Sequence, residues 1–188
     1  MKIYKPGALK LPASVITIGA LDGVHKGHQA LLRKTKEQAK KLGIPFVIYT
    51  FDPPPKVFLK DCLMLTTLDE KLKRLKMMGA EHVIVGKFDE MFMKKDVFVF
   101  IEELKELNPL EIWEGPDFQF GKNKRGNIEI LRRHFKVGVL NPLKCEQGKI
   151  ISSSRIRNLM LKGENAQAEK LLGDINCMSG TFENSFAI

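Results

Sequence analysis

Short runs of β-branched and aromatic residues alternate with amphipathic segments along almost the whole chain. The segments between and after these runs place apolar residues at the three- and four-residue spacing of a helix. Because strand and helix alternate almost without exception, the sequence predicts an α/β fold. We expect a doubly wound, mainly five-stranded parallel sheet with helices on both faces. The five predicted strands span residues 14–19, 45–51, 82–86, 110–115 and 136–140.

The length of 188 residues is enough for one domain with a sizeable core. No apolar run approaches the roughly 20 residues that a membrane span needs, and the first residues lack the hydrophobic region of a signal peptide. Cys62, Cys145 and Cys177 are scattered and odd in number, which argues against a disulfide framework and a zinc site. We therefore expect a cytoplasmic protein without a membrane partner.

The formal net charge of +9 has three interpretations. A basic surface can bind nucleic acid, steer small polyphosphates into a cleft, or simply solvate helix faces. No basic run is interleaved with aromatic residues, and the lysines fall largely on predicted helix faces. The charge alone decides nothing, and we predict no nucleic-acid partner.

The stretch TIGALDGVHKGHQALL, residues 17–32, begins as a strand and ends as a helix that Gly43 should terminate. It contains neither a Walker A loop nor the G-x-G-x-x-G fingerprint. Amide groups at a helix N-terminus suit phosphate oxygens, and glycine lets the backbone approach them closely. We expect the helix to begin near His28, with His25 in the turn and Gly27 leaving room for a phosphate. The alternative is a glycine-rich turn with incidental surface histidines.

A second unusual segment, ISSSRIRNLMLKG, lies at residues 151–163. One of Ser152, Ser153 and Ser154 should cap the helix that follows, without the sequence saying which. The other hydroxyls and one arginine could then hold phosphate. We predict that Arg155 reaches the cleft, because it is nearer to the cap, and that Arg157 lies to the side. The alternative is capping alone, with both arginines on the surface.

These segments should meet in space. In open parallel sheets, ligands bind beyond the carboxyl ends of the strands. Residues 17–32 follow the first predicted strand directly, and TFDPPPKVF, WEGPDFQFG and ISSSRIR also lie at strand ends. We therefore expect all four segments at one edge of the sheet.

Taken together, these motifs resemble those of a known protein family. H-x-G-H after a first strand, with a late S-S-S-R-I-R, resembles the nucleotidyltransferase superfamily. The fuller set, with TFDPPP, GPDFQFGKNKRGN and KGENAQAEKLLG, is similar to the FMN adenylyltransferase module of prokaryotic FAD synthetases over roughly residues 11–173. That family usually has phenylalanine where Leu21 stands and histidine where Pro54 stands, and Pro116 is also unusual. These differences concern how the flavin is bound.

The resemblance implies that ATP and FMN react to give FAD and pyrophosphate, with Mg²⁺ bridging the phosphates. His25 and His28 would stabilise the α- to γ-phosphates, and Arg155 would act with them as a catalytic residue. Asp22 would brace the turn rather than contact substrate. Further contacts to ATP are expected from Gly19, Ala20, Leu21, Gly27, Ser152, Ser153, Ser154 and Arg157. The flavin contacts are expected from Phe51, Asp117 and Phe118, and the candidate outer metal ligands are Asp52 and Asp117.

The resemblance also suggests a domain division. Residues 1–175 would form the nucleotidyltransferase domain, and residues 176–188 resemble only the first residues of a riboflavin kinase domain. We expect no phosphorylation of riboflavin, and a separate riboflavin kinase could supply FMN. Three alternatives stay open: another phosphorylated acceptor, a non-catalytic flavin- or nucleotide-binding regulator, and a nucleic-acid-binding protein. The oligomeric state is not predicted.

Overall fold

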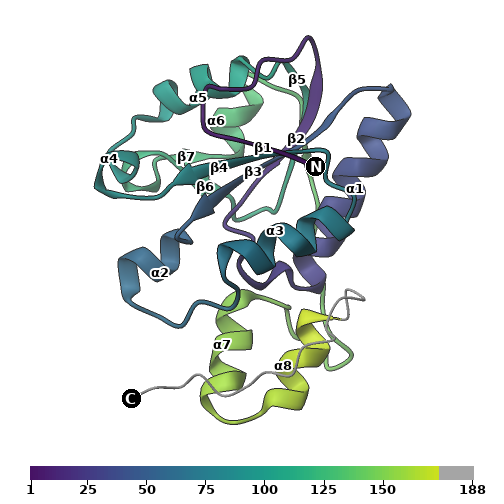
Figure 1. The fold of residues 1–188 in the computed structure, drawn as a ribbon, viewed down its shortest axis with the longest axis vertical. Coiled ribbons are helices and arrows are strands. Elements are labelled where there is room, and N and C mark those ends of the chain that lie inside the picture. Colours follow the sequence, from purple (N-terminus) through teal and green to yellow (C-terminus); the bar gives the residue numbers. More distant parts are fainter. Residues whose placement is uncertain (174–188) are drawn as a thin grey trace.

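A computed structural model describes residues 1–173 of the chain (Figure 1). A six-stranded sheet forms its centre, and neighbouring strands are parallel throughout. The predicted α/β class and parallel sheet are therefore confirmed, with one strand more than expected. The predicted tail at 176–188 lies outside the described residues. In order across the sheet, the strands are β1 (Lys2–Tyr4), β4 (His82–Lys87), β3 (Phe46–Asp52), β2 (Ser14–Ile18), β5 (Pro109–Glu114) and β8 (Val137–Val139).

The additional strand is β1, which pairs with β4 at the edge of the sheet. It has three residues, and its one aliphatic side chain, Ile3, is 52% exposed. Three residues are too few to show an alternating pattern, and an edge strand need not bury both faces. This strand could therefore not be predicted from periodicity.

The helices cover both faces of the sheet, as predicted. Helices α1 (Lys26–Leu42) and α3 (Leu68–Met77) pack on one face, while α5 (Val97–Lys105) and α6 (Ile128–Arg132) pack on the other. Strand β3 shows why: Phe46 and Ile48 belong to the first core, whereas Val47 and Tyr49 belong to the second. A parallel strand buried on both faces needs such a continuous apolar run. Each fully buried Ile or Phe contributes about 1.5–3 kcal/mol through the hydrophobic effect.

Helix α1 begins at Lys26, two residues before the expected start at His28. His25 supplies the N-cap in an extended conformation, so the helical turns begin immediately after it. Gly43 ends the helix in the left-handed region, with φ of 66°, as the sequence predicted.

Several short elements were not predicted, because each is too short for a periodic pattern. They are η1 (Asp22–Val24), α2 (Pro55–Lys60), α4 (Glu90–Met93), η2 (Lys122–Lys124) and the hairpin of β6 (Gln119–Phe120) with β7 (Gly126–Asn127). Helices α7 (Ser153–Leu161) and α8 (Asn165–Leu172) pack against each other and lie below the sheet in Figure 1. Within residues 1–173, no helix has the length and apolar character needed to cross a bilayer.

The strand order fixes where a ligand can bind. Strand β2 lies between β3 and β5, and the chain leaves β2 toward β3 on one side but later returns to place β5 on the other. Adjacent connections thus run in opposite directions, which opens a crevice beyond the carboxyl ends of β2 and β5. Residues 19–25 follow β2 directly into that crevice.

Candidate active site

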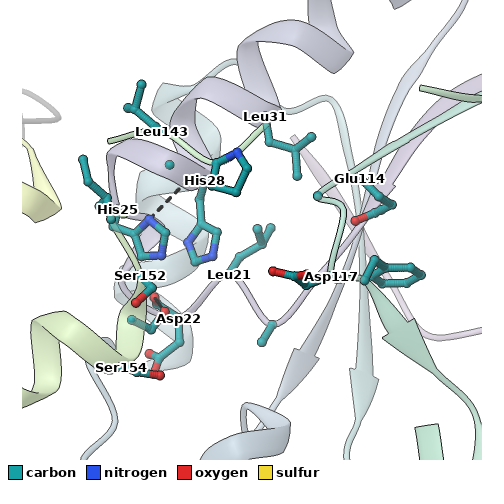
Figure 2. Close-up of a pocket in the computed structure, with 18 of the residues that line it drawn as sticks. Leu21, Asp22, His25, His28, Leu31, Glu114, Asp117, Leu143, Ser152 and Ser154 are labelled. Carbon is teal, nitrogen blue, oxygen red and sulfur yellow. Dashed lines mark hydrogen bonds between the residues drawn. The ribbon is translucent and has the colours of Figure 1, made fainter. Parts of the chain in front are cut away.

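A cavity of about 450 Å³ lies beyond the carboxyl ends of β2 and β5 (Figure 2). Its walls come from all four of the segments expected to meet there, together with residues 140–143. The predicted gathering of these segments is therefore confirmed. The predicted site residues that line it are Gly19, Ala20, Leu21, His25, Gly27, His28, Asp117, Phe118, Ser152, Ser153, Ser154 and Arg157. Phe51, Asp52 and Arg155 are not among its lining residues.

The turn after β2 is held in an unusual backbone conformation. Leu21 and Val24 have positive φ values of 49° and 40°, which residues other than glycine rarely adopt. The carboxylate of Asp22 stabilises the turn, because its Oδ1 accepts hydrogen bonds from the amides of Leu65 and Thr66. Asp22 thus braces the turn, as expected, and ties it to the segment that precedes α3.

The two histidines form a stacked pair at the start of α1. Their ring centroids are 3.6 Å apart, with 16° between the ring planes. Nδ1 of His25 accepts a hydrogen bond from the backbone amide of His28, at 3.3 Å. A neutral His25 with Nδ1 as acceptor carries its proton on Nε2. A Cβ on Gly27 would lie 3.1 Å from Cε1 of His25, so only glycine fits there without displacing that ring.

Both imidazoles are neutral at pH 7. Burial lowers the pKa of His25 to about 4. Burial also lowers the pKa of His28 well below its usual range, and the nearby His25 and Lys71 act in the same direction. Nδ1 of His28 is buried and has no hydrogen-bond partner among the described residues. Each ring therefore brings hydrogen-bonding capacity to the cavity, and His28 has an unsatisfied nitrogen that a ligand could pair.

The depressed pKa of His25 predicts a pH-dependent stability. The unfolded chain binds a proton at His25 below pH 6.5, whereas the folded chain does so only below about pH 4. The contribution of neutral His25 to the unfolding free energy is therefore fully present above pH 6.5 and is lost as the pH falls toward 4. Between pH 7.5 and 5, the wild type should lose about 2 kcal/mol more unfolding free energy than His25→Asn, whose amide oxygen can still cap α1.

Urea denaturation of both proteins at the two pH values would measure this difference. The other titrating groups are present in both proteins, and burial, the main cause of the lowered pKa of His28, is common to both as well. Equal pH dependence in the two proteins would show that His25 is not held neutral by the fold.

The serine segment begins α7. Ser152 is the N-cap, because its Oγ accepts a hydrogen bond from the backbone amide of Arg155. Oγ of Ser153 donates to the backbone oxygen of Asp22 at 3.0 Å, which fastens α7 to the turn after β2. Oγ of Ser154 accepts a hydrogen bond from Nζ of Lys56. Only one of the three hydroxyls is therefore occupied in capping.

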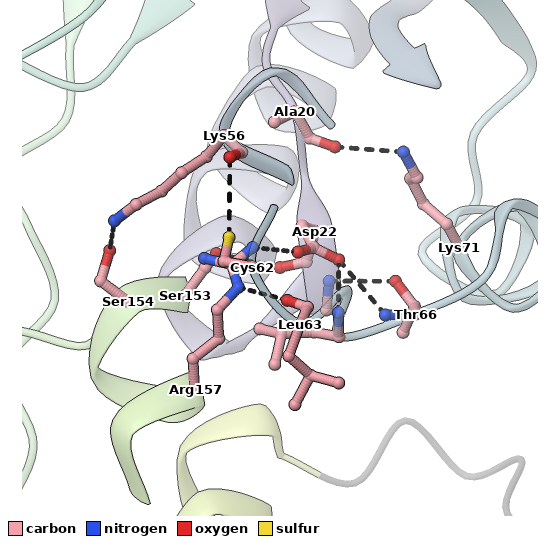
Figure 3. A network of polar contacts seen from close by, with 12 residues as sticks. Ala20, Asp22, Lys56, Cys62, Leu63, Thr66, Lys71, Ser153, Ser154 and Arg157 are labelled. Atoms are coloured by element: carbon pink, nitrogen blue, oxygen red, sulfur yellow. Dashed lines mark hydrogen bonds and ion pairs between the residues drawn. The ribbon is translucent and has the colours of Figure 1, made fainter. Parts of the chain in front are cut away.

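The two arginines differ from the prediction in position. Arg157 is 5% exposed, lines the cavity and forms a buried ion pair with Asp22, while its Nε donates to the backbone oxygen of Leu63 (Figure 3). Arg155 points away from the cavity and donates to Sγ of Cys145 at 3.1 Å and to a neighbouring carbonyl. The expectation that Arg155 reaches this cleft is wrong for this structure. Nearness to the cap was a poor guide, because the carboxylate of Asp22 draws the other arginine inward.

Arg157 also has one unsatisfied nitrogen. Its Nη1 is buried and has no hydrogen-bond partner within residues 1–173. A buried guanidinium nitrogen without a partner is costly. An anionic oxygen in the cavity would satisfy it.

Three further side chains near the cavity were not predicted. Lys56 lines the cavity, and its signal in the sequence is a cation directly after three prolines. Lys71 is fully buried, and its Nζ donates to the backbone oxygen of Ala20 (Figure 3). The same Nζ donates to the backbone oxygen of Phe51, so Lys71 joins the chain that follows β2 to the end of β3. Glu114 lies at the opposite side of the cavity from the histidines, and burial raises the pKa of its carboxyl well above the usual range.

A second cavity of about 360 Å³ adjoins the first, because Ile18 and Phe118 line both. Phenylalanine is the commonest residue in its walls, and two cations, Lys95 and Lys124, also line it. Nζ of Lys95 lies 4.6 Å from the ring centre of Phe92. Phe51, predicted as a flavin contact, lines this second cavity. The phenylalanines around it are Phe51, Phe88, Phe92, Phe100, Phe118 and Phe120.

The predicted metal ligands are not brought together. Asp117 lines the first cavity, whereas Asp52 lines neither cavity. Residues 1–173 contain no group of three or more His, Cys, Asp or Glu side chains placed to hold a metal ion. A divalent cation here would depend largely on ligand phosphates for its coordination.

Comparisons with known proteins agree with this geometry. A family model described as FAD synthetase matches residues 9–155. The chain is 47% identical over 174 residues to a Geobacillus thermodenitrificans protein named "Putative bifunctional riboflavin kinase/FMN adenylyltransferase", covering 92% of this chain and 97% of that protein. It is 35% identical over 176 residues to the bifunctional riboflavin kinase/FMN adenylyltransferase of Escherichia coli K12, covering 88% of this chain but only 56% of that relative.

Two solved structures are also similar. One, described as a macrolide-efflux protein from Streptococcus pneumoniae, has a TM-score of 0.81 and 31% identity, over 92% of this chain and 62% of that chain. The other, pantothenate synthetase from Thermus thermophilus, has a TM-score of 0.51 at 12% identity, over 88% of this chain and 76% of that one. The second likeness concerns the fold alone.

Proposed function

Because the chain belongs to the FAD synthetase family, we propose that it transfers the adenylyl group of ATP to FMN, giving FAD and pyrophosphate. The observation that carries this proposal is the pair of unsatisfied buried nitrogens, Nδ1 of His28 and Nη1 of Arg157, in residues that line one cavity. Buried polar groups are normally paired, so such atoms indicate a ligand with oxygen atoms. The neighbouring Lys56 adds a further cation, which favours phosphate.

The two adjoining cavities suit the two substrates. The first carries its donors on the side of α1 and α7, where helix N-termini favour the triphosphate of ATP. The second has an aromatic lining that suits a flat, apolar isoalloxazine ring, and Phe118 lies between the two. A flavin in the second cavity could direct its phosphate toward the first.

The chemistry asks little of the protein beyond position and charge. An oxygen of the FMN phosphate attacks the α-phosphorus of ATP in line, a new P–O bond forms, and the bond to the pyrophosphate oxygen breaks. A phosphate monoester is already an anion at pH 7, so the step needs no strong general base. His25 and His28 would donate hydrogen bonds to the phosphate oxygens as charge shifts toward the leaving group.

The other residues would hold the leaving group and the nucleotide. Arg157 would bind the departing pyrophosphate with Nη1, while Asp22 keeps its guanidinium in place. The hydroxyl groups of the serine segment would add hydrogen bonds. Gly19 and Ala20 would cover the nucleotide with backbone.

The residues fit Mg²⁺ only as an ion bound by one carboxylate together with the substrate phosphates. The carboxylate of Asp117 lines the cavity and has no hydrogen bond or ion pair with another residue of the described chain, so it could hold an ion through one oxygen or a water. Mg²⁺ commonly binds through one or two carboxylates and substrate phosphates. When bound, it would neutralise charge on the phosphates.

The proposal predicts FAD as a product. The 188-residue protein, incubated with ATP, MgCl₂ and FMN, should form FAD and pyrophosphate in equal amounts, measured by chromatography and a pyrophosphate assay. Parallel reactions with phosphopantetheine and nicotinamide mononucleotide test the alternative acceptors. Turnover of one of these without FAD formation would assign a different acceptor. Binding of both ATP and FMN without turnover would support the regulator instead.

A further inference from the structure

A third cavity of about 460 Å³ lies on the other side of the first turn of α7. It is bounded by the loop at 143–151, by α8 and by the start of α1. None of its lining side chains is aromatic, so it offers no surface on which a nucleotide base could stack. The lining residues that carry the argument are Lys26, Lys144, Cys145, Arg155, Gln167 and Lys170.

The charge around this cavity is unbalanced. Lys26, Lys144, Arg155 and Lys170 bring four cations from four parts of the fold, and Glu146 is the single carboxylate in the lining. None of these five side chains forms an ion pair with another residue of the described chain. Like charges that share a hollow repel one another unless an anion lies between them.

Arg155 is oriented in this cavity by neutral acceptors alone. Its Nη1 donates to Sγ of Cys145 and to the backbone oxygens of Lys149 and Ile150, and its Nη2 donates to Oε1 of Gln147. Among the described residues, the guanidinium is therefore held in place without a carboxylate partner. An oriented, uncompensated guanidinium is well suited to bind a phosphate group.

The third cavity adjoins the phosphate end of the first. Leu143 and Ile151 line both, and the backbone oxygen of Ile151 lies beside Gly27, between the two histidines in sequence. Leu143 and Ile151 thus separate the first cavity from the third. An anion released from the first cavity would meet the third close by.

We propose that this third cavity is a second anion site that binds inorganic pyrophosphate after it leaves the first cavity. The inference rests on the proposed function for the origin of the pyrophosphate, but not for its binding. Several negative charges on a compact ion match four cations around a hollow without aromatic groups. A single phosphate carries less charge and should bind more weakly.

Cys145 provides a local probe for the occupant. It is a free, partly exposed thiol in the lining, and its hydrogen bond with Arg155 lowers the pKa of the thiol, which favours alkylation. The protein would first be saturated with an ATP analogue that has a methylene bridge between the α- and β-phosphates, so that the first cavity is filled. Iodoacetamide labelling of Cys145 would then be followed by peptide mass spectrometry as pyrophosphate is added, with Cys62 as internal control.

We expect pyrophosphate to slow the labelling of Cys145 at least fivefold, to leave Cys62 unchanged, and to act at lower concentration than inorganic phosphate. Calorimetry on the same analogue complex should show pyrophosphate binding that weakens at least tenfold in Lys144→Gln/Lys170→Gln. The matched control is Lys5→Gln/Lys40→Gln, which removes two exposed charges elsewhere and should leave binding unchanged.

The site would be overturned if Cys145 were not protected, or if both double variants bound pyrophosphate as the wild type does. Both readouts are independent of FAD formation. Protection of Cys145 in a protein that forms no FAD would refute the proposed function and keep the anion site. FAD formation without protection of Cys145 would support the proposed function and refute the anion site.

Discussion

Replacing His28 with alanine should lower the rate of FAD formation by a factor of about 10²–10³, the usual cost of losing one preorganised donor to a developing charge. The imidazole is neutral, stacks on His25, and has an unpaired Nδ1 beside the cavity. No other side chain of the described residues hydrogen-bonds this ring, so the melting temperature should fall only slightly. Initial rates at saturating ATP and FMN, with thermal melting followed by circular dichroism, would measure both effects.

A second histidine variant provides the control. His82 lies on β4, contacts Tyr4 and does not line the cavity, so His82→Ala should retain full turnover. Wild-type rates in folded His28→Ala would remove the histidine from the mechanism. Equal losses in both variants would point to a general effect on the fold.

The parts of the fold that could be predicted are those fixed by long patterns. The strand at residues 45–51 is almost entirely apolar because it is buried between two helical layers. Gly43 marks the end of α1 because glycine adopts the left-handed conformation there at little cost. The strand alternation then placed all four unusual segments at one edge. The meeting of these segments thus followed from topology, whereas the choice of side chains that enter the cavity did not.

The parts that could not be predicted depend on contacts between segments far apart in the sequence. Lys56 donates to Ser154, which lies 98 positions away in the sequence. Lys71, on α3, donates to the backbone oxygens of Ala20 and Phe51. No local pattern records such contacts. The two arginines show the same limit, because the inward turn of Arg157 depends on Asp22, which lies 135 positions away.

Arg157 should therefore matter more than Arg155 for turnover. Arg157→Lys keeps a positive charge opposite Asp22 but loses the forked guanidinium and its free Nη1, so FAD formation should fall by about 10². Arg155→Lys and Arg155→Ala should both retain turnover within about threefold, because Arg155 points away from the first cavity. Rates and melting temperatures of the three variants would be compared under the same conditions.

Asp22→Asn separates binding from architecture. Breaking a buried ion pair costs about 3–5 kcal/mol of stability when one partner is lost, so a loss of turnover in an Arg157 variant could reflect a loosened turn. Asp22→Asn removes the charge of the carboxylate but keeps an acceptor for the amides of Leu65 and Thr66 and leaves the guanidinium in the cavity. If Arg157 binds the leaving group, Asp22→Asn should lower the melting temperature more than Arg157→Lys does and yet retain the greater turnover. The opposite order would mean that Arg157 serves only to hold the turn, and that the pyrophosphate is bound by other groups.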